Sequence, residues 1–203
     1  MGPAQFAALA GAEDEQVADL ARFLEILRDW NARMNLVGAS TLDAFWSRHA
    51  WDSAQLLRLA PDALTWADLG AGAGFPGVVL AILLKGREEA MVHLVESMAK
   101  RCRFLTETAG ALALPARVHN ARAEDLKLKV DVVTARAVAP LTRLLGFAQP
   151  YIARGATGLF LKGQDADAEI AEARQMWRFE VDVLPSLSDP RGRILRIERL
   201  ARA

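Results

Sequence analysis

The first part of the chain carries apolar side chains at helical spacing. Between Glu15 and Trp30 they recur every three or four positions with charged residues between them, which predicts an amphipathic helix that buries one face against a partner surface. Its apolar positions are Val17, Leu20, Leu24 and Leu27. Further on, Ser40 with Asp43 three residues later has the pattern of a capping box and predicts the start of a second helix. Residues 1–60 are therefore expected to form a helical extension packed on the rest of the chain.

Beyond Pro61 the pattern changes to short apolar runs that alternate with longer helical stretches, as in a parallel sheet with crossover helices. The predicted strands cover residues 64–69, 92–95, 117–120, 130–135 and 158–161. The helices between them are expected to begin near Pro76, Ser97 and Pro140. Two late runs, 181–184 and 194–197, flank a turn-rich segment and predict an antiparallel hairpin. We therefore predict an α/β domain over residues 61–203, with a seven-stranded, mostly parallel sheet and helices on both faces.

Composition places this domain among globular proteins. Hydrophobic residues make up 52% of the 203 positions and charged residues 25%, so the chain can bury a sizeable core. Lysine plus arginine and aspartate plus glutamate each number 25, and this balance does not indicate a polyanionic partner. The charges are unevenly spread, with basic residues clustered in the middle of the chain and near its end. A local basic face stays open, as does the alternative of ordinary solvated surfaces.

Cysteine and histidine are too sparse for several kinds of site. Cys102 is the only cysteine, which excludes an internal disulfide and fits a reducing compartment. The three histidines lack the short spacing of zinc ligands, so we expect no metal. The longest apolar run, residues 78–84, is too short to span a membrane, and acidic residues interrupt the start of the chain. We expect a cytoplasmic, monomeric protein without a membrane partner.

A glycine-rich loop, Asp68 to Gly77, lies between the first predicted strand and a helix. Glycine lets the backbone turn sharply and approach a ligand, and the helix start behind it offers unpaired amides. Gly72, Gly74 and Gly77 also satisfy the spacing of dinucleotide-binding loops, so a nicotinamide dinucleotide stays an alternative. We favour S-adenosylmethionine because Asp68, at the strand end, would repel a pyrophosphate and attract the ammonium group of that cofactor.

Acidic side chains follow the next two predicted strands. Glu96 ends the second strand, where a carboxylate accepts ribose hydroxyls, although dinucleotide sites use an acidic residue in the same way. After the third strand, Glu124 or a neighbouring backbone amide at Ala123 could bond the edge of an adenine. The alternative is an acidic pair, Glu124 with Asp125, that only stabilises a helix N-terminus.

The residues after the fourth strand narrow the chemistry. They lack the Pro-Pro-aromatic sequence common where exocyclic amines are methylated, and Cys102 is poorly placed in a predicted helix to be a nucleophile for carbon methylation. A ring nitrogen such as guanine N7 loses no proton on attack, so alignment and electrostatics suffice. Arg136 is then the expected residue between cofactor and target, and Lys162, at the end of the fifth strand, is either a phosphate contact or merely solvated.

The chain resembles the bacterial small-subunit (16S) ribosomal RNA guanine-N7 methyltransferases, also called glucose-inhibited division protein B. The motifs that carry the resemblance span most of the chain and are Trp30-Asn31, Asn35-Leu36, Arg48-His49 with Asp52-Ser53, Asp68 to Gly77, Glu96-Ser97 with Lys100-Arg101, Ala123-Glu124, Arg136-Ala137 and Lys162-Gly163. The sequence departs from the family at Ala71, where serine or threonine is usual, and at Ala135, where serine is usual. Both departures remove a hydroxyl that could contact the cofactor or substrate.

The resemblance implies a class I Rossmann-like methyltransferase that moves the methyl group of S-adenosylmethionine to N7 of one guanine in the decoding-region loop of 16S rRNA. The cofactor contacts implied by the resemblance are Gly70, Phe75, Ala123, Glu124 and Arg136, to which our own interpretation adds Asp68, Gly72 and Glu96. Candidate RNA-binding residues are Arg48, His49, Lys100, Arg101, Arg103, Lys162, Arg191 and Arg193. Asp52 is a candidate for the negative charge that favours a cationic purine. Alternatives are another RNA or a small molecule as the acceptor, or a cofactor-sensing module without turnover.

Overall fold

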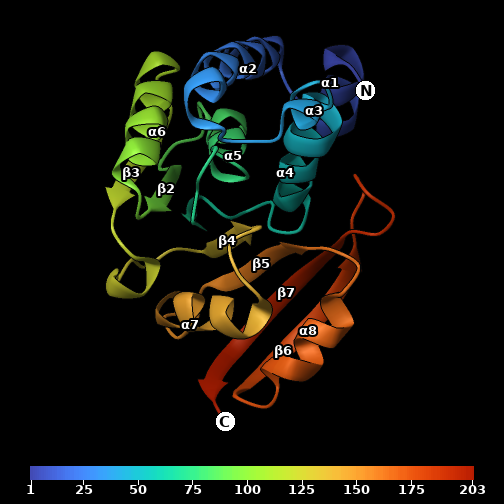
Figure 1. The fold of residues 1–203 in the computed structure, drawn as a ribbon, viewed down its shortest axis with the longest axis vertical. Coiled ribbons are helices and arrows are strands. Elements are labelled where there is room, and N and C mark those ends of the chain that lie inside the picture. The colour runs from blue at the N-terminus through green and yellow to red at the C-terminus, as the bar shows by residue number, and fades with distance from the viewer.

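The structure is a computed structural model that describes the backbone of residues 1–203 and every side chain except that of Ala39. The strands are β1 (Thr65–Leu69), β2 (Met91–Glu96), β3 (Ala116–Asn120), β4 (Val132–Arg136), β5 (Thr157–Lys162), β6 (Trp177–Pro185) and β7 (Arg193–Arg202). They form one sheet in the order β3-β2-β1-β4-β5-β7-β6 (Figure 1). β7 is antiparallel to β5 and β6, and the other neighbours are parallel. The predicted seven-stranded, mostly parallel sheet with a closing hairpin is confirmed.

The N-terminal part of the chain is helical. α2 (Asp14–Met34) contains the whole segment predicted as amphipathic and begins at a capping box of Glu13 and Gln16. The other elements before the sheet are α1 (Pro3–Ala10), α3 (Ala39–Leu42), the π-helical η1 (Phe45–Trp51), α4 (Asp52–Ala54) and the 3₁₀ turn η2 (Gln55–Arg58). The predicted cap at Ser40 is wrong, because α3 starts after Gly38 and Ser40 already lies inside its first turn.

Two of the three predicted helix starts after the first strand are confirmed. α5 (Gly77–Leu84) follows Pro76, and α7 (Leu141–Ile152) follows Pro140. α6 (Ala99–Ala111) is not capped by Ser97, because the carboxylate of Glu96 accepts the hydrogen bond of the Met98 amide at 2.8 Å. The remaining helices are η3 (Ala123–Asp125) and α8 (Ala166–Ala173).

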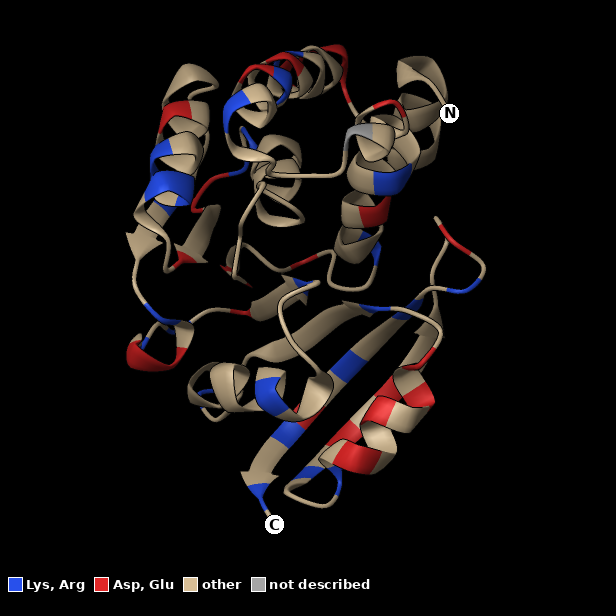
Figure 2. Ribbon diagram, in the orientation of Figure 1, with Lys and Arg blue, Asp and Glu red and all other residues tan. Residues whose placement is uncertain are grey.

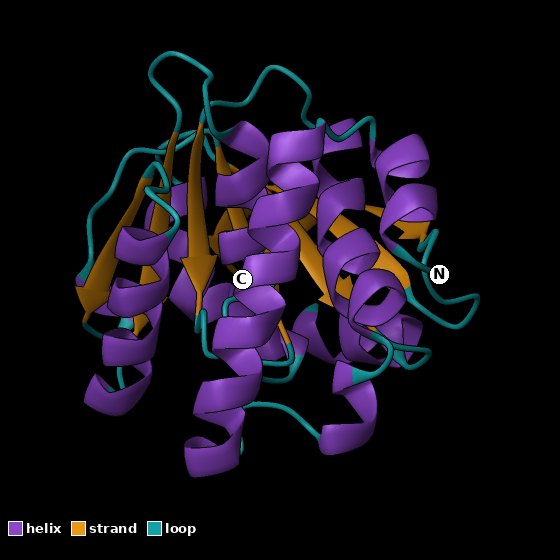
Figure 3. Cartoon of the chain, turned by 90° about the horizontal axis from the view of Figure 1, so that it is seen from above, coloured by secondary structure: helices purple, strands orange, loops and turns teal.

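Helices cover both faces of the sheet (Figure 3). All eight residues of α5 are buried between the sheet and the N-terminal helices. On α2, Phe23 meets the rings of Phe45, Phe75 and Phe104 at centroid distances of 5.9, 5.4 and 6.5 Å. The second cluster, under α7 and α8, centres on Tyr151 and Phe160. The aromatic contacts bring the N-terminal helices onto the glycine loop.

Two features of the described residues concern membrane insertion and metal binding. None of the helices that they form is both long and apolar enough to cross a membrane. The described side chains also contain no group of three histidine, cysteine, aspartate or glutamate residues able to hold a metal ion.

Candidate active site

A small cavity lies at the carboxyl ends of the parallel strands, beside the glycine loop. Its volume is about 150 Å³. Four residues predicted to bind the cofactor line it, namely Gly70, Glu96, Ala123 and Glu124. Its apolar walls are Leu69, Val95, Val138 and Phe147. Apolar walls with carboxylates at the rim suit an adenosine, whose base is flat and whose ribose hydroxyls are hydrogen-bond donors.

Gly70 shapes the floor of this cavity. Its φ is +67°, a left-handed conformation that side chains disfavour. A Cβ there would come within 2.8 Å of Cγ2 of Val138. Glycine at this position therefore keeps the loop folded and the space above it open.

Asp68 lies beneath the glycine loop. Its carboxyl group is fully buried and accepts hydrogen bonds from the Gly77 amide at 2.8 Å and from the Thr134 hydroxyl at 3.5 Å. Burial raises the pKa of Asp68 to about 7. The predicted contact with a cofactor ammonium is not met, because the carboxyl group turns inward to the start of α5. Asp68 holds the loop in shape instead.

Glu96 joins the glycine loop to α6. Its carboxylate accepts the Gly72 amide at 3.1 Å and the Met98 amide at 2.8 Å, and Arg101 lies 3.8 Å away. The side chain is buried, so it is not simply solvated. This carboxylate is fixed at the rim of the cavity, where ribose hydroxyls were expected.

The far end of the cavity is formed by η3. The hydroxyl of Tyr151 donates to the carbonyl oxygen of Ala123 at 2.9 Å, which fixes that backbone. Glu124 pairs with Arg122 at 3.2 Å, on the cavity rim. The predicted adenine contacts at Ala123 and Glu124 stay predictions.

Arg136 ends β4 and reaches into the N-terminal helices. Nη1 donates to the carbonyl oxygen of Arg48 at 2.8 Å and to Oδ2 of Asp52 at 3.1 Å. Nη2 lies 2.8 Å from Nδ1 of His49, and the guanidinium sits 4.9 Å from the ring centroid of Phe75. The structure thus brings both candidate catalytic residues, Arg136 and Asp52, into contact.

His49 is buried between Arg136 and Phe75. Its ring stacks on Phe75 with centroids 4.3 Å apart and planes at 12°. A guanidinium has donors only, so Nδ1 must accept from Arg136 and the proton must sit on Nε2. Burial, together with the charges of Arg136 and Arg48, lowers the pKa of His49 to about 3. His49 is therefore neutral, and its predicted contact with RNA stays a prediction.

Phe75 was predicted as a cofactor contact, but its side chain packs against the N-terminal helices. The ring is buried among Phe23, Phe45, His49 and Arg136. It is not part of the lining of the 150 Å³ cavity. Phe75 instead wedges the glycine loop against the N-terminal helices, so only its backbone remains available near a ligand.

Two open cavities, each of about 470 Å³, flank the Arg136–Asp52 pair. Asp52, Arg136, Ala137 and Asp189 line both of them. One extends toward Lys162 and Arg193, and the other toward Arg48 and His49. The pair therefore stands at the centre of a larger concave surface.

The predicted RNA-binding residues near this surface differ in how exposed they are and in how many protein groups they already contact. Lys162 is only 10% exposed, pairs with Glu169 at 2.6 Å and donates to Ala139 O at 3.1 Å, so its predicted phosphate contact is not supported. Arg193 donates to the carbonyl oxygens of its own turn. Arg191 is exposed, with Asp189 at 3.8 Å. Of the three, Arg191 is the most available to a ligand.

A basic cluster lies on α6, which begins shortly after Glu96 and Ser97 of the 150 Å³ cavity lining. Lys100 and Arg103 are exposed, and Arg101 is half-buried beside Glu96. Figure 2 shows basic residues on α6 and acidic residues gathered along α8. Cys102 points inward, where burial raises the pKa of its thiol and its Sγ bonds the Glu96 carbonyl oxygen at 3.2 Å. It is therefore not a nucleophile.

Two residues that contact Asp52 could not be identified from the sequence. Gln55 and Ser188 both bond Asp52, although they lie in a 3₁₀ turn and in the β6–β7 loop. Only the fold brings those segments together. Ala71 and Ala135, the two departures from the family, are buried and line neither the 150 Å³ cavity nor the two cavities beside Arg136.

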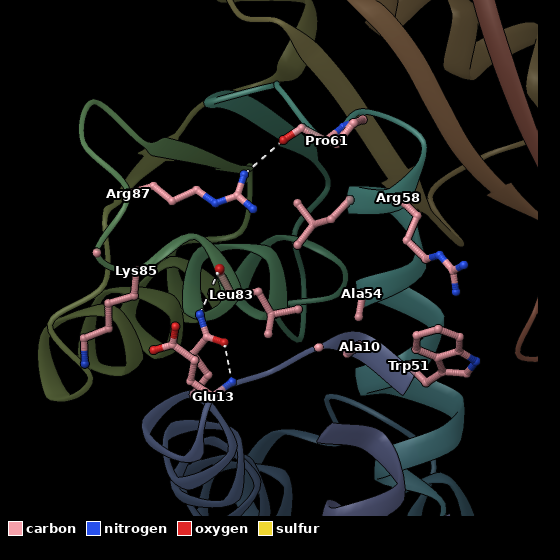
Figure 4. Close-up of a pocket in the computed structure, with 13 residues that line it drawn as sticks. Ala10, Glu13, Trp51, Ala54, Arg58, Pro61, Leu83, Lys85 and Arg87 are labelled. Atoms are coloured by element: carbon pink, nitrogen blue, oxygen red, sulfur yellow. Dashed lines mark hydrogen bonds between the residues drawn. The ribbon is translucent and has the colours of Figure 1, made fainter. Parts of the chain in front are cut away.

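A further cavity of about 540 Å³ lies at the amino ends of β1 and β2, where Pro61, Leu83 and Arg87 line it (Figure 4). Trp51 and Ala54 form its apolar wall. None of the predicted site residues lines it. The candidate chemistry therefore belongs to the opposite edge of the sheet.

Comparison with known proteins agrees with this arrangement. Residues 16–193 match the family model of the rRNA small subunit methyltransferase G. The chain is 65% identical to a protein of that name from Caulobacter vibrioides, covering 98% of this chain and 92% of the relative. It is 48% identical to another from Methylobacterium radiotolerans, covering 98% and 95%.

Solved structures share the fold at low identity. The SAH-bound Podospora anserina methyltransferase PaMTH1 superposes with a TM-score of 0.62 at 14% identity, covering 92% of this chain and 88% of that one. The likeness confirms the predicted class I Rossmann-like methyltransferase fold. Because the family model matches residues 16–193, which is most of the chain, the chain belongs to the rRNA small subunit methyltransferase G family.

Proposed function

We propose that this chain transfers the methyl group of S-adenosylmethionine to N7 of one guanine in the decoding-region loop of 16S rRNA. The observation that carries the proposal is the Arg136–Asp52 ion pair near the cofactor cavity, in a member of an rRNA methyltransferase family. Relatives that match over nearly their full lengths are named ribosomal RNA small subunit methyltransferase G.

S-adenosylmethionine supplies an electrophilic methyl group on a sulfonium when bound. We assign its adenosine part to the 150 Å³ cavity, with Glu96 toward the ribose and the η3 backbone toward the adenine. Gly70 supports this assignment, because a Cβ there would come within 2.8 Å of Val138, which lines the cavity. Gly72 is held by Glu96 and keeps the loop close to the ligand.

The target side needs no base. N7 of guanine has a free lone pair, so methylation removes no proton and leaves a positive charge on the purine. A carboxylate nearby stabilises that charge, and an unbalanced cation opposes it. Asp52 offsets the charge of Arg136, and the neutral His49 adds none. Arg136 and Asp52 would align the base and balance the charge as the bond forms.

RNA binding is assigned to exposed basic side chains around this edge of the sheet, namely Arg48, Lys100, Arg103 and Arg191. Phosphate contacts of this kind position RNA without reading its sequence. The acidic residues of α8 (Figure 2) would repel the RNA phosphates and restrict the path of the RNA. On this view Arg48 and Asp52 of residues 1–60 serve the target together with basic side chains of residues 61–203, and the cofactor site lies within residues 61–203.

Labelled methyl transfer to small subunits from a strain that lacks this activity tests the proposal. We expect one N7-methylguanine, mapped by borohydride and aniline cleavage, and a parallel assay on stripped 16S rRNA compares the assembly states. Calorimetry should show binding of S-adenosylmethionine and none of NAD. Methylation at another atom, or no transfer to either substrate, would contradict the proposal.

A further inference from the structure

Gln55 is buried between Asp52 and the β6–β7 loop, with only 2% of its surface exposed. On one side, its Oε1 accepts a hydrogen bond from the amide of Leu187 at 2.7 Å. On the other side, its Nε2 donates to Oδ1 of Asp52 at 3.1 Å and to the Asp52 carbonyl oxygen at 3.0 Å. One amide therefore joins this loop to the carboxylate that pairs with Arg136.

The β6–β7 loop, residues 186–192, is a shared wall of the two flanking cavities. Ser186, Asp189, Arg191 and Gly192 line one cavity, and Ser188, Asp189 and Pro190 line the other. Ser188 also donates through its hydroxyl to Oδ1 of Asp52, and the Trp51 indole donates to the Leu187 carbonyl oxygen at 3.2 Å. The β6–β7 loop and the Asp52 carboxylate are thus held together by hydrogen bonds.

We propose that Gln55 is a positioning residue for methyl transfer, which holds Asp52 toward Arg136 and fixes the β6–β7 loop as a wall of the two cavities that flank this pair. The inference rests on the proposed function, since it takes the Arg136–Asp52 pair as the target side. Gln55 and Ser188 occupy Oδ1 of Asp52, which leaves Oδ2 for the contact with Arg136.

The chemistry of the amide explains why glutamine stands here. Its oxygen accepts from the loop backbone while its nitrogen donates to the carboxylate, and neither an acid nor an apolar side chain does both. A glutamate would place a second negative charge against Asp52. A leucine would leave both the Leu187 amide and the carboxylate without this partner.

Gln55→Leu and Gln16→Leu form a matched pair of variants. Gln16 also bridges two segments with one amide, accepting from the Glu13 amide and donating to the Leu83 carbonyl oxygen, both at 3.0 Å. It lies on α2 and lines the 540 Å³ cavity, which contains none of the predicted site residues. We expect Gln55→Leu to lower kcat about tenfold with the Kd for S-adenosylmethionine unchanged within about twofold, because misplaced groups cost turnover. Gln16→Leu should lower Tm and leave kcat unchanged.

A resonance of Arg136 gives a readout that does not depend on activity. Its Nε–H signal, assigned by its loss in Arg136→Lys, should move in Asp52→Asn and in Gln55→Leu, and stay in place in Gln16→Leu. Gln55→Leu should add nothing to the kcat loss of Asp52→Asn, because both act through one carboxylate. An unmoved resonance in Gln55→Leu, or an equal kcat loss in Gln16→Leu, overturns the inference. Full activity of Asp52→Asn would instead overturn the role of Asp52 in the proposed function, and the resonance still decides the role of Gln55.

Discussion

Arg136 and Asp52 lie 84 positions apart in the sequence, yet Nη1 of one and Oδ2 of the other are 3.1 Å apart. The side chains are 19% and 17% exposed, so water screens the pair only partly. Burial lowers the pKa of Arg136, and the charge of Asp52 opposes that effect. The pair joins the end of β4 to the N-terminal helices.

Arg136→Lys should lower kcat about 100-fold, or about 3 kcal/mol of transition-state stabilisation. Lysine keeps the charge but cannot serve the Arg48 carbonyl oxygen, Asp52 and His49 together in one plane. Single-turnover methyl transfer to small subunits measures the effect.

Arg199→Lys is the control for that change. The side chain of Arg199 is 78% exposed and pairs with Glu180 at 2.8 Å. Such a surface ion pair contributes little to stability. We expect kcat within about twofold of the unmodified enzyme. Equal losses in the two variants would show that the geometry around Arg136 is not required.

Gly70→Ala should lower the free energy of unfolding by about 1–3 kcal/mol and weaken S-adenosylmethionine binding about tenfold. Its positive φ disfavours a side chain, and the added methyl group meets Val138 beside the cavity. Urea denaturation and calorimetry measure the two effects.

Gly110→Ala is its counterpart within α6, where a Cβ meets nothing within 4 Å. Helix propensity predicts no loss, or a gain of up to about 1 kcal/mol. If Gly70→Ala kept full cofactor affinity, the assignment of the 150 Å³ cavity to adenosine would be wrong.

Asp68 should make the protein less stable as pH rises. Its folded pKa is about 7 against an ordinary 3.8, so between these values the folded chain holds a proton that the unfolded chain has lost. Stability from this group is present at low pH and is lost as pH rises through about 7. Asp68→Asn should remove a pH dependence of up to about 4 kcal/mol between pH ~4 and ~7.5. Denaturation of both proteins across that window gives the difference, and parallel curves would contradict the burial argument.

His49 should make the protein less stable as pH falls. Its folded pKa is about 3 against 6.5, so the unfolded chain binds the extra proton and stability is lost as pH falls through that window. His49→Asn keeps an acceptor for Arg136 and should remove this dependence, about 1.4 kcal/mol per pH unit. The kcat profile of the unmodified enzyme should show no inflection from His49 above pH ~5.

The double variant Lys100→Ala, Arg103→Ala should raise KM for small subunits about tenfold and reduce the salt slope of binding by about 1–2. Both side chains are exposed on α6, and kcat should not change. Lys162→Ala should instead cost about 1–3 kcal/mol of stability, because Glu169 loses its partner. A salt slope altered by Lys162→Ala would restore Lys162 as a phosphate contact.

The fold was largely predictable because its signals are local. Short apolar runs located all seven strands, although β6 begins at Trp177, ahead of the predicted residue 181. The errors at Ser40 and Ser97 concern caps, where the path of the preceding chain decides which group meets the first free amides. Side-chain type alone did not determine that path.

The sequence by itself determined the sheet, the glycine loop and the residue types at the strand ends, since these depend on periodicity and on backbone freedom within a few positions. Only the tertiary structure decided which way those side chains face. It turned Asp68 inward to Gly77, placed Phe75 among aromatic rings, and set Gln55 beside Asp52. Such contacts join segments far apart in the chain, and packing chooses among orientations that local sequence leaves equal.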